Sequence, residues 1–398
     1  MKKTEKNKKA YLPAPPSWRI GRNPACLLLH LVGYRRMLLL SSGGLAGIWI
    51  FLAVSSSVSL IIAGRVASGV CLGVVTNCAC LYVADVSPPS KRAFFGSLVE
   101  VSTSAGALVA YLLGGLAWQL QAAGCALASM PVLALHAYAI ENPRWLQMRG
   151  RPLDADTAVM RLYGVDPPPD FRPQRPDAAR AEPAQLRWPR QARMVVACLL
   201  LHLLQNLSCA QFLLLRAVQV LGTAVADMPA QAVAAFVVAL HVGFTAMVAA
   251  VTNIARRHRL LGASSSLVAG VLFIFRPLEY MGFGEWSVDE QPSVTSWGAL
   301  LSVTSLMLAY SVGLCHLPTL LTGELLPSRL RHPASSFIWA SRWLVAFVLL
   351  HFEVDVLSSL SQRASLLALS MMVLLVAATV VLLVPDTEGR TLGDIESG

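Results

Sequence analysis

The sequence contains few charged residues for its length. Only 14% of its 398 side chains are charged and 55% are hydrophobic, whereas a soluble protein of this size has a larger polar share. Apolar windows of about 20 residues, long enough to cross a bilayer core of roughly 30 Å, recur along most of the chain. The composition therefore predicts an all-α membrane protein.

Patterns typical of enzymes and metal sites are also missing. The eight cysteines lie almost all inside apolar runs without a metal-ligand spacing, so we interpret them as small buried hydrophobic residues. The sequence shows no hydrolytic triad and no glycine loop that would cradle a phosphate. We expect no enzyme activity, no metal and no cofactor. A secretory signal is not visible either, because residues 1–22 are basic and polar and the apolar run 25–32 is too short.

Ten apolar segments predict membrane-spanning helices, arranged as four and then six. The predicted spans are residues 37–55, 58–84, 94–117, 119–140, 194–216, 230–255, 260–275, 297–321, 334–350 and 364–384. The predicted domains are a basic arm (1–36), an incomplete four-span bundle (37–140), a proline- and arginine-rich linker (141–193), a six-span bundle (194–384) and a tail (385–398).

The positions of the basic residues predict the topology. The formal net charge of +10 is compatible with nucleic-acid binding, but 27 of the 32 Lys and Arg lie in segments that fall on one side of a ten-span membrane protein. Cytoplasmic loops carry such an excess. We therefore predict that both termini and the linker are cytoplasmic and that nucleic acid is not a partner. We expect the plasma membrane as the destination, although no retention signal is evident and an internal membrane stays open as an alternative.

A short pattern of an acid, a proline and an arginine occurs at two equivalent places. Asp85, Pro88 and Arg92 follow one predicted span, and Glu324, Pro327 and Arg331 follow another with the same spacing. Two further pairs of marks occur in the same order: GYRR (33–36) with RRHR (256–259), and ENPR (141–144) with PDTEGR (385–390). They predict two related halves, from Met37 to Arg144 and from about Leu260 to Arg390, as in transporters built from repeats. We expect each acid to pair with the arginine of its own half and to act as a conformational latch.

These marks resemble the sugar porter family of the major facilitator superfamily, from about Gly33 to Ile395. The motifs are YVADVSPPSKR, ENPRWL, QNLS, GELLPSRLR and PDTEGRTLGDIE, together with Gly64-Arg65, Gly69 and Gly73. The GELLP form is most similar to arthropod trehalose and hexose facilitators. The resemblance implies a two-bundle fold and transport of a hexose or a trehalose-like disaccharide by alternating access, as facilitated diffusion. The family has twelve helices, and nothing before Gly33 resembles the first, which lines the substrate path in this fold.

The resemblance also implies the site residues, some of which depart from the family pattern. The expected sugar contacts include the amides of Gln205, Asn206 and Gln211, which offer both a donor and an acceptor to hydroxyl groups, and Trp343. Glu100, His241 and Arg342 stand where the family has amides. The expected cytoplasmic gating network is Arg35, Arg36, Asp85, Arg92, Glu141, Arg144, Glu324 and Arg331.

Several interpretations remain open at this stage. Glu100 and Arg342 lie inside predicted spans, where a lone charge is costly. They fit a proton-coupled or organic-anion carrier, a mutual ion pair, or the decay of an unselected copy. His241 fits a packed, hydrogen-bonded histidine as well as a substrate contact. The whole chain also fits a transport-dead truncated paralogue, or a sensor or partner subunit. The sequence does not predict which sugar is carried or the oligomeric state.

Overall fold

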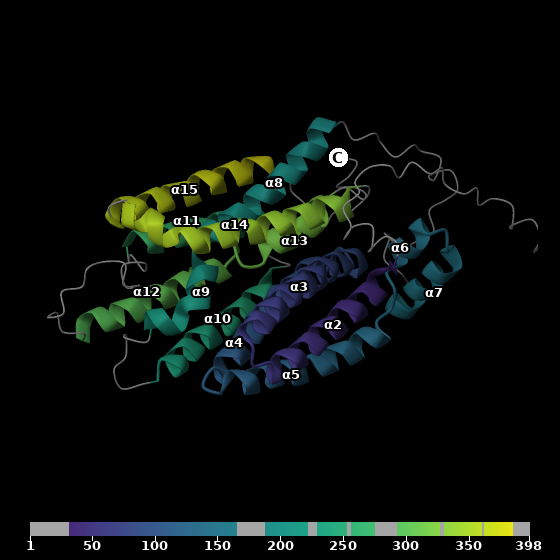
Figure 1. Ribbon diagram of the computed structural model, residues 1–398. Coiled ribbons are helices and arrows are strands. Elements are labelled where there is room, and N and C mark those ends of the chain that lie inside the picture. The colour runs from purple at the N-terminus through teal and green to yellow at the C-terminus, as the bar shows by residue number, and fades with distance from the viewer. Residues whose placement is uncertain are drawn as a thin grey trace, which may run out of the picture.

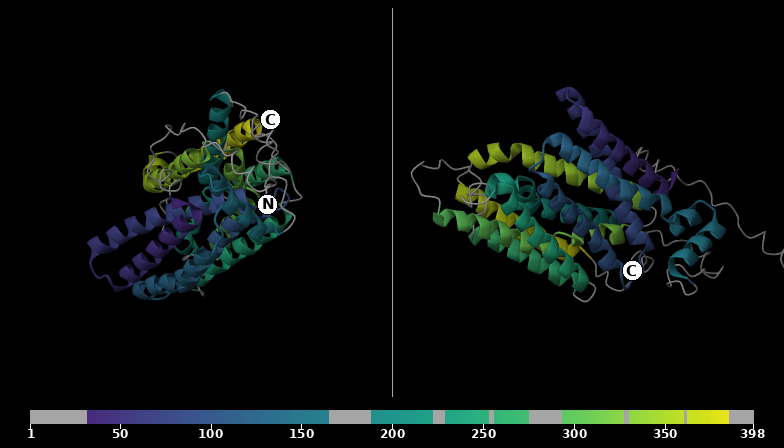
Figure 2. Two further views of the ribbon diagram at one scale, coloured as in Figure 1. Left: turned by 90° about the vertical axis from the view of Figure 1, so that its right-hand side faces the viewer. Right: turned by 90° about the horizontal axis from the view of Figure 1, so that it is seen from below.

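The computed structural model describes residues 32–164, 188–221, 229–252, 256–274, 293–326, 330–359 and 362–384, and over these residues its regular structure is entirely α-helical. The helices run lengthwise beside one another in an elongated bundle (Figures 1 and 2). They are α2 (Tyr34–Val54), α3 (Val58–Val86), α4 (Arg92–Leu113), α5 (Trp118–Tyr138), α6 (Pro143–Met148), α7 (Pro152–Tyr163), α8 (Trp188–Leu207), α9 (Ala210–Leu221), α10 (Ala230–Val251), α11 (Arg257–Ile274), α12 (Ser293–Ser311), α13 (Leu317–Leu325), α14 (Arg331–Ser359) and α15 (Gln362–Leu383).

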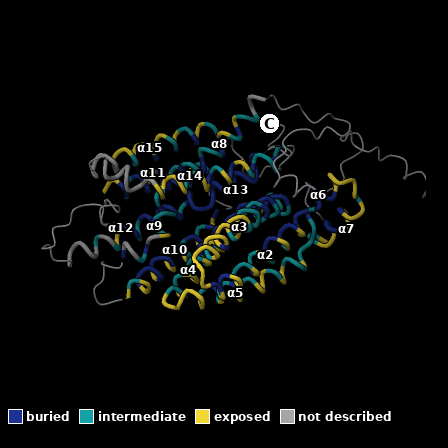
Figure 3. The backbone as a smooth tube through the Cα atoms, in the orientation of Figure 1, coloured by how far each residue is buried: buried dark blue, intermediate teal, exposed yellow. Residues whose placement is uncertain are grey.

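Each of the ten predicted spans coincides with a helix or with two consecutive helices, so the predicted all-α fold is confirmed. Six of the described helices are long and apolar enough to cross a bilayer, and three shorter apolar helices accompany them. α3 has the lowest buried share of the six, with 6% of its apolar window buried. The side chains of Leu60, Ile62, Val66 and Val70 are exposed on it, as expected for a helix that meets lipid. Figure 3 shows α3 mostly in the colours of exposed and intermediate residues.

Two predicted spans are interrupted, whereas the sequence predicts a single continuous helix for each. The span expected at 194–216 breaks between α8 and α9, where Cys209 has a φ of 56°, and this left-handed conformation cannot continue a helix. The span expected at 297–321 breaks between α12 and α13. There Gly313 packs against the backbone of α11, and a Cβ at this position would lie 2.7 Å from the Leu260 carbonyl oxygen. Glycine is therefore required by the close approach of the two backbones.

The contacts between helices repeat in the two halves of the chain. α2 packs against α3 and α5 in the first half, and α11 packs against α12 and α15 in the second. The predicted repeat matches α2 with α11, α3 with the pair α12 and α13, and α5 with α15. The same neighbours thus occur in the same order in both halves, which supports an internal duplication.

The segment expected to be a linker contains helices at both of its ends. α6 and α7 lie in its first half and pack on each other at one end of the bundle (Figure 1), and α8 begins six residues before the expected boundary. Asn142 caps α6, because its Oδ1 accepts from the backbone N–H groups of Arg144 and Trp145, and Pro143 provides the favoured first residue. Residues 165–187, the arm up to residue 31 and the tail from residue 385 lie outside the described residues.

Helices of the two halves also pack directly on one another. α4 runs along α10, and α13 contacts both α3 and α4. Two glycines make the latter contacts close: a Cβ at Gly96 would lie 2.7 Å from Leu320 Cδ1, and a Cβ at Gly323 would lie 2.7 Å from Ala84 Cβ. Small residues at such positions let membrane helices approach closely.

Candidate functional site

The two interrupted helices meet at their interruptions. Gln205, near the end of α8, donates from Nε2 to the hydroxyl of Tyr310 (3.0 Å) and to the carbonyl of Cys315 (3.0 Å), at the break between α12 and α13. Its Oε1 lies 3.2 Å from Nδ1 of His202. Both amide protons of this fully buried side chain are therefore used within the protein. In this conformation Gln205 holds the two breaks together.

The other two predicted amides surround Arg342 of α14. Asn206 donates from Nδ2 to the backbone carbonyl of Arg342 at 3.1 Å, and Gln211 Oε1 accepts from Arg342 Nη2 at 3.4 Å. The structure therefore brings Gln205, Asn206 and Gln211 to one region, at the break between α8 and α9, and their role as sugar contacts stays a prediction.

Glu100 and Arg342 form an ion pair between the two halves. Their nearest charged atoms, Glu100 Oε1 and Arg342 Nη1, lie 3.9 Å apart, and the two side chains are only 10% and 7% exposed. Glu100 Oε1 also accepts from the hydroxyl of Thr319 at 2.7 Å. The Arg342 guanidinium lies 4.9 Å from the ring centre of Trp339 and 5.7 Å from that of Trp343, distances at which cations are attracted to aromatic faces. This geometry agrees with the interpretation of Glu100 and Arg342 as a mutual ion pair. We call Glu100, Arg342, Thr319, Gln211, Asn206 and the two tryptophans the central site.

His241 is a packed histidine on α10. Its Nδ1 lies 2.7 Å from the hydroxyl of Ser311, and its Nε2 lies 3.1 Å from the hydroxyl of Ser104 on α4. The ring is buried. With both nitrogens engaged, His241 joins α10 to α4 and α12.

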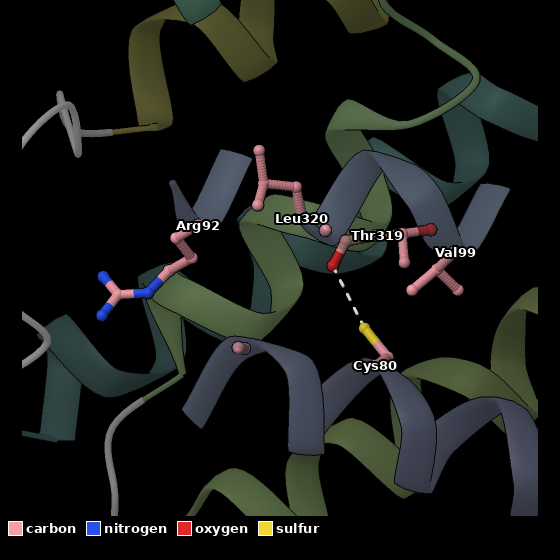
Figure 4. A pocket seen from close by; sticks show the side chains of 7 residues that line it. Cys80, Arg92, Val99, Thr319 and Leu320 are labelled. Carbon is pink, nitrogen blue, oxygen red and sulfur yellow. Dashed lines mark hydrogen bonds between the residues drawn. The ribbon is translucent and has the colours of Figure 1, made fainter. Parts of the chain in front are cut away.

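A narrow pocket lies beside the central site, between α3, α4 and α13 (Figure 4). Cys80 and Thr319 face each other across it, and the Cys80 thiol lies 3.4 Å from the Thr319 carbonyl. Its lining consists of Cys80, Ala84, Arg92, Gly96, Val99, Thr319 and Leu320. Because Thr319 both lines the pocket and binds Glu100, the pocket adjoins the central site.

The motif acids gather at one end of the bundle, which we call the charged end. Asp85 at the end of α3 forms an ion pair with Arg331 at the start of α14. It also accepts from Asn142 Nδ2 at 2.9 Å and from the Tyr34 hydroxyl at 3.4 Å. Asp85 and Arg331 are both buried. The expected pairing within each half is wrong for this acid, because its partner arginine belongs to the other half.

Glu324, the second motif acid, forms an ion pair with Arg257 at the start of α11, so its expected pairing with Arg331 is wrong as well. Arg92 donates to the backbone carbonyl of Ser87 at 3.4 Å. Glu324 therefore closes its own half through α11, in the same way that Asp85 contacts Tyr34 at the start of α2. These partners depend on helix arrangement and are not encoded in local spacing.

The remaining predicted gating residues lie around α6. Glu141 Oε1 accepts from the backbone N–H groups of Arg35 and Asn142, each at 3.1 Å. The Arg35 guanidinium donates to the Ala137 carbonyl, and Arg36 is exposed. Glu141 thereby fixes the start of α2 to the turn before α6.

His202, Tyr310 and Trp339 are among the residues of these clusters that no sequence motif marks. Only His202 has a local signal, because it lies one helical turn before Gln205. The positions of Tyr310 and Trp339 follow from how α12 and α14 pack against α8, and the sequence alone does not show this.

Comparison with known proteins agrees with this architecture. A family model described as sugar (and other) transporter matches residues 20–398. The chain belongs to this family. The members of this family are transporters, and together with its apolar helices this makes the protein a multi-pass membrane protein. It is 27% identical over 403 residues to the human solute carrier family 2, facilitated glucose transporter member 6, covering 95% of this chain and 79% of the human one.

Other transporters of this family are similar over much of the chain. The facilitated trehalose transporter Tret1 of Drosophila virilis is 24% identical over 380 residues, covering 92% of this chain and 41% of the fly protein. Among solved structures, the proton:xylose symporter XylE bound to 6-bromo-6-deoxy-D-glucose matches with a TM-score of 0.74 and 17% identity, covering 94% of this chain and 86% of that one. This likeness confirms the major facilitator fold. In length, the chain spans less than half of the fly Tret1 protein.

Proposed function

We propose that this protein carries a sugar across the membrane by alternating access. The contact between the two interrupted helices supports this proposal most directly, because transporters build substrate sites from discontinuous helices near the middle of the membrane. Here the breaks in α8–α9 and α12–α13 meet through Gln205, and Asn206 and Gln211 place two further amides beside them. Amides suit sugar hydroxyls because each can donate and accept.

The substrate that we propose is a hexose or a trehalose-like disaccharide, carried as facilitated diffusion. The names of the human and fly relatives support this class. We assign substrate contacts to Gln205, Asn206, Gln211, Arg342, Trp343 and Glu100, and we leave His241 as a packed histidine. In the described conformation the Gln205 amide is occupied by the protein, so we expect it to exchange its partners for sugar hydroxyls as the two halves move.

We further propose that the charged end faces the cytoplasm of a plasma-membrane protein and acts as the gate. The Asp85–Arg331 pair joins the four-span bundle (37–140) to the six-span bundle (194–384), and it has to break if those bundles separate at this end. This gate also includes the Glu324–Arg257 pair and the charged residues Arg35, Arg36, Arg92, Glu141 and Arg144. The segment between the bundles (141–193), the arm (1–36) and the tail (385–398) then lie on the cytoplasmic side.

Uptake of radiolabelled sugar into proteoliposomes tests this proposal. We expect saturable uptake of D-glucose or trehalose that exceeds uptake into empty vesicles, and no saturable uptake of L-glucose, which has the wrong stereochemistry for a fixed set of amides. If neither D-glucose nor trehalose enters faster than into empty vesicles, the proposal is contradicted and a role without transport takes its place.

A further inference from the structure

Arg342 is a buried arginine with unused hydrogen-bond donors. A guanidinium carries five N–H donors, yet among the described residues this side chain donates one long bond, from Nη2 to Gln211 at 3.4 Å. Its Nε is buried and has no partner there, although the side chain is only 7% exposed. Buried polar groups are normally hydrogen-bonded. The central site therefore offers donors that the protein itself does not occupy.

The counter-ion of Arg342 leaves these donors available. Glu100 lies 3.9 Å away, which is too long for a hydrogen bond, because its Oε1 is directed to the Thr319 hydroxyl instead. Glu100 therefore balances the charge of Arg342 without accepting hydrogen bonds from its planar guanidinium group. A fork of this kind is matched by a second carboxylate that binds it with two parallel bonds.

The groups around Arg342 suit the rest of a sugar. Gln211 and Asn206 contact Arg342 with their side-chain amides, and Trp343 is 40% exposed beside it. A ligand that combines ring hydroxyls with a carboxylate would use the amides and the arginine together. A neutral hexose would offer only uncharged hydroxyl groups to the unused N–H donors of Arg342.

A second carboxylate in this buried place raises a problem of charge. With Glu100 ionised, one cation would face two anions, and like charges in a shared site cannot all remain ionised. Proton uptake by Glu100 restores neutrality and leaves Arg342 to the substrate. The other charged or titratable groups around Glu100 are Arg342 on α14, Cys80 on α3, and Tyr310 and Cys315 on either side of the α12–α13 break. Cysteine and tyrosine ordinarily lose their protons only at alkaline pH, so Glu100 is the acceptor among these groups.

We propose that the central site carries sugar acids, with the carboxylate of a hexuronate bound by Arg342 and one accompanying proton held on Glu100. This inference rests on the proposed sugar transport. The substrate enters as the carboxylate and the proton enters separately. The pair leaves together, so no net charge crosses the membrane and no bond is made or broken in the sugar.

Uptake of radiolabelled D-glucuronate into proteoliposomes of the full chain tests the inference, with D-glucose measured in the same vesicles and empty vesicles as the background. We expect an inward proton gradient to accelerate D-glucuronate uptake and not D-glucose uptake. Arg342→Gln should lower the selectivity for D-glucuronate over D-glucose by at least about tenfold, because a bidentate charged contact is lost. Arg342→Lys should restore only part of it. Glu100→Gln imitates the protonated acid, so it should remove the effect of the gradient while D-glucuronate still binds.

Arg65 on α3 provides the matched control. It is another arginine of a spanning helix, and its guanidinium lies over a tryptophan, 5.1 Å from the ring centre of Trp49. Arg65→Gln should leave the selectivity within about twofold, because Arg65 is exposed and is not part of the central site. Lactate, a carboxylate without the ring, should compete poorly, and equal competition by lactate would contradict recognition of a sugar acid.

The outcomes separate the two proposals. If D-glucose is transported and D-glucuronate neither enters nor competes, the inference is overturned and sugar transport stands. If neither sugar enters, sugar transport fails, and thermal unfolding of the purified protein decides whether the site binds D-glucuronate. Absence of stabilisation by D-glucuronate would then overturn the inference as well. Equal selectivity in Arg342→Gln and in the unaltered protein, with both folded by the same thermal measurement, would also overturn it.

Discussion

Replacement of Asp85 by asparagine is expected to open the charged end of the bundle. Asp85 and Arg331 are both 4% exposed, and Arg331 is held in place by two bonds to the Leu326 carbonyl at 3.2 Å. Asp85→Asn removes the charge and leaves the arginine buried without it. Breaking a buried ion pair by removing one partner costs about 3–5 kcal/mol. Since about 1.4 kcal/mol corresponds to a factor of ten, the closed arrangement should lose more than about a hundredfold of its advantage over an open one.

Distance measurements between spin labels can detect this opening. Labels at Ser90, in the turn after α3, and at Ala334, in the first turn of α14, report on the two sides of the ion pair. We expect a single short distance in the unaltered protein and a longer, dominant one in Asp85→Asn and in Arg331→Gln. The double variant should open less than the sum of the two single ones, because no unpaired buried charge remains.

The control is the Arg151–Asp154 pair on α7, which is also an ion pair at 2.7 Å but has side chains that are 57% and 53% exposed. Exposed pairs contribute about 0–1 kcal/mol, so Asp154→Asn should leave the distances unchanged. The reasoning is refuted if Asp85→Asn also leaves the distance distribution unchanged, because the ion pair would then not hold the two halves together.

Three further outcomes follow from the packing and the hydrogen bonds. Gly323→Ala places a methyl group 2.7 Å from Ala84 Cβ and should destabilise the protein by about 1–3 kcal/mol through overpacking. Gly243→Ala, where a Cβ would have nothing within 4 Å, should stabilise it by up to about 1 kcal/mol, so equal melting temperatures of the two purified variants would contradict this account. Gln205→Ala should destabilise by about 1–3 kcal/mol for each buried partner that is left unsatisfied, and should reduce sugar uptake; a variant that melts and transports like the unaltered protein would show that the two helix breaks do not depend on Gln205. Asn142→Asp keeps the cap of α6 but places a carboxylate against Asp85, which now accepts from Asn142 at 2.9 Å, so thermal unfolding should show a larger loss than for Asn142→Ala, and the reverse order would count against this account of Asn142.

The course of the spanning helices was predictable from the sequence because long apolar runs have few alternatives. Within the described residues each of the ten predicted spans forms one helix or two consecutive helices, and the repeat of the marks at Asp85 and Glu324 agrees with the repeated contacts of α2 and α11. α6 was predictable in principle, since Asn142 and Pro143 form a favoured helix start. The proline and arginine content of the segment from 141 to 193 nevertheless favoured a linker.

The breaks and the ion-pair partners were not predictable in the same way. The break at Cys209 has neither a glycine nor a proline to announce it, and it depends on the conformation of one residue. Gly313 did mark the other break, but its role follows from contact with Leu260, 53 positions earlier in the printed sequence. Asp85 selects Arg331 and not the nearby Arg92 because α14 of the other half lies against α3. Such partners are fixed by the arrangement of helices and not by spacing along the chain.

The central claim is that sugar crosses when α3 and α14 separate, and a reversible cross-link between them tests it most directly. Asn77 on α3 donates to the Ser336 hydroxyl on α14 at 3.1 Å, so a protein carrying both Asn77→Cys and Ser336→Cys should form a disulfide on oxidation. D-glucose uptake into proteoliposomes should be lost in the oxidised protein and return after reduction, while each single variant is unaffected by oxidation. Uptake by the fully cross-linked protein at the rate of the reduced one would contradict the account.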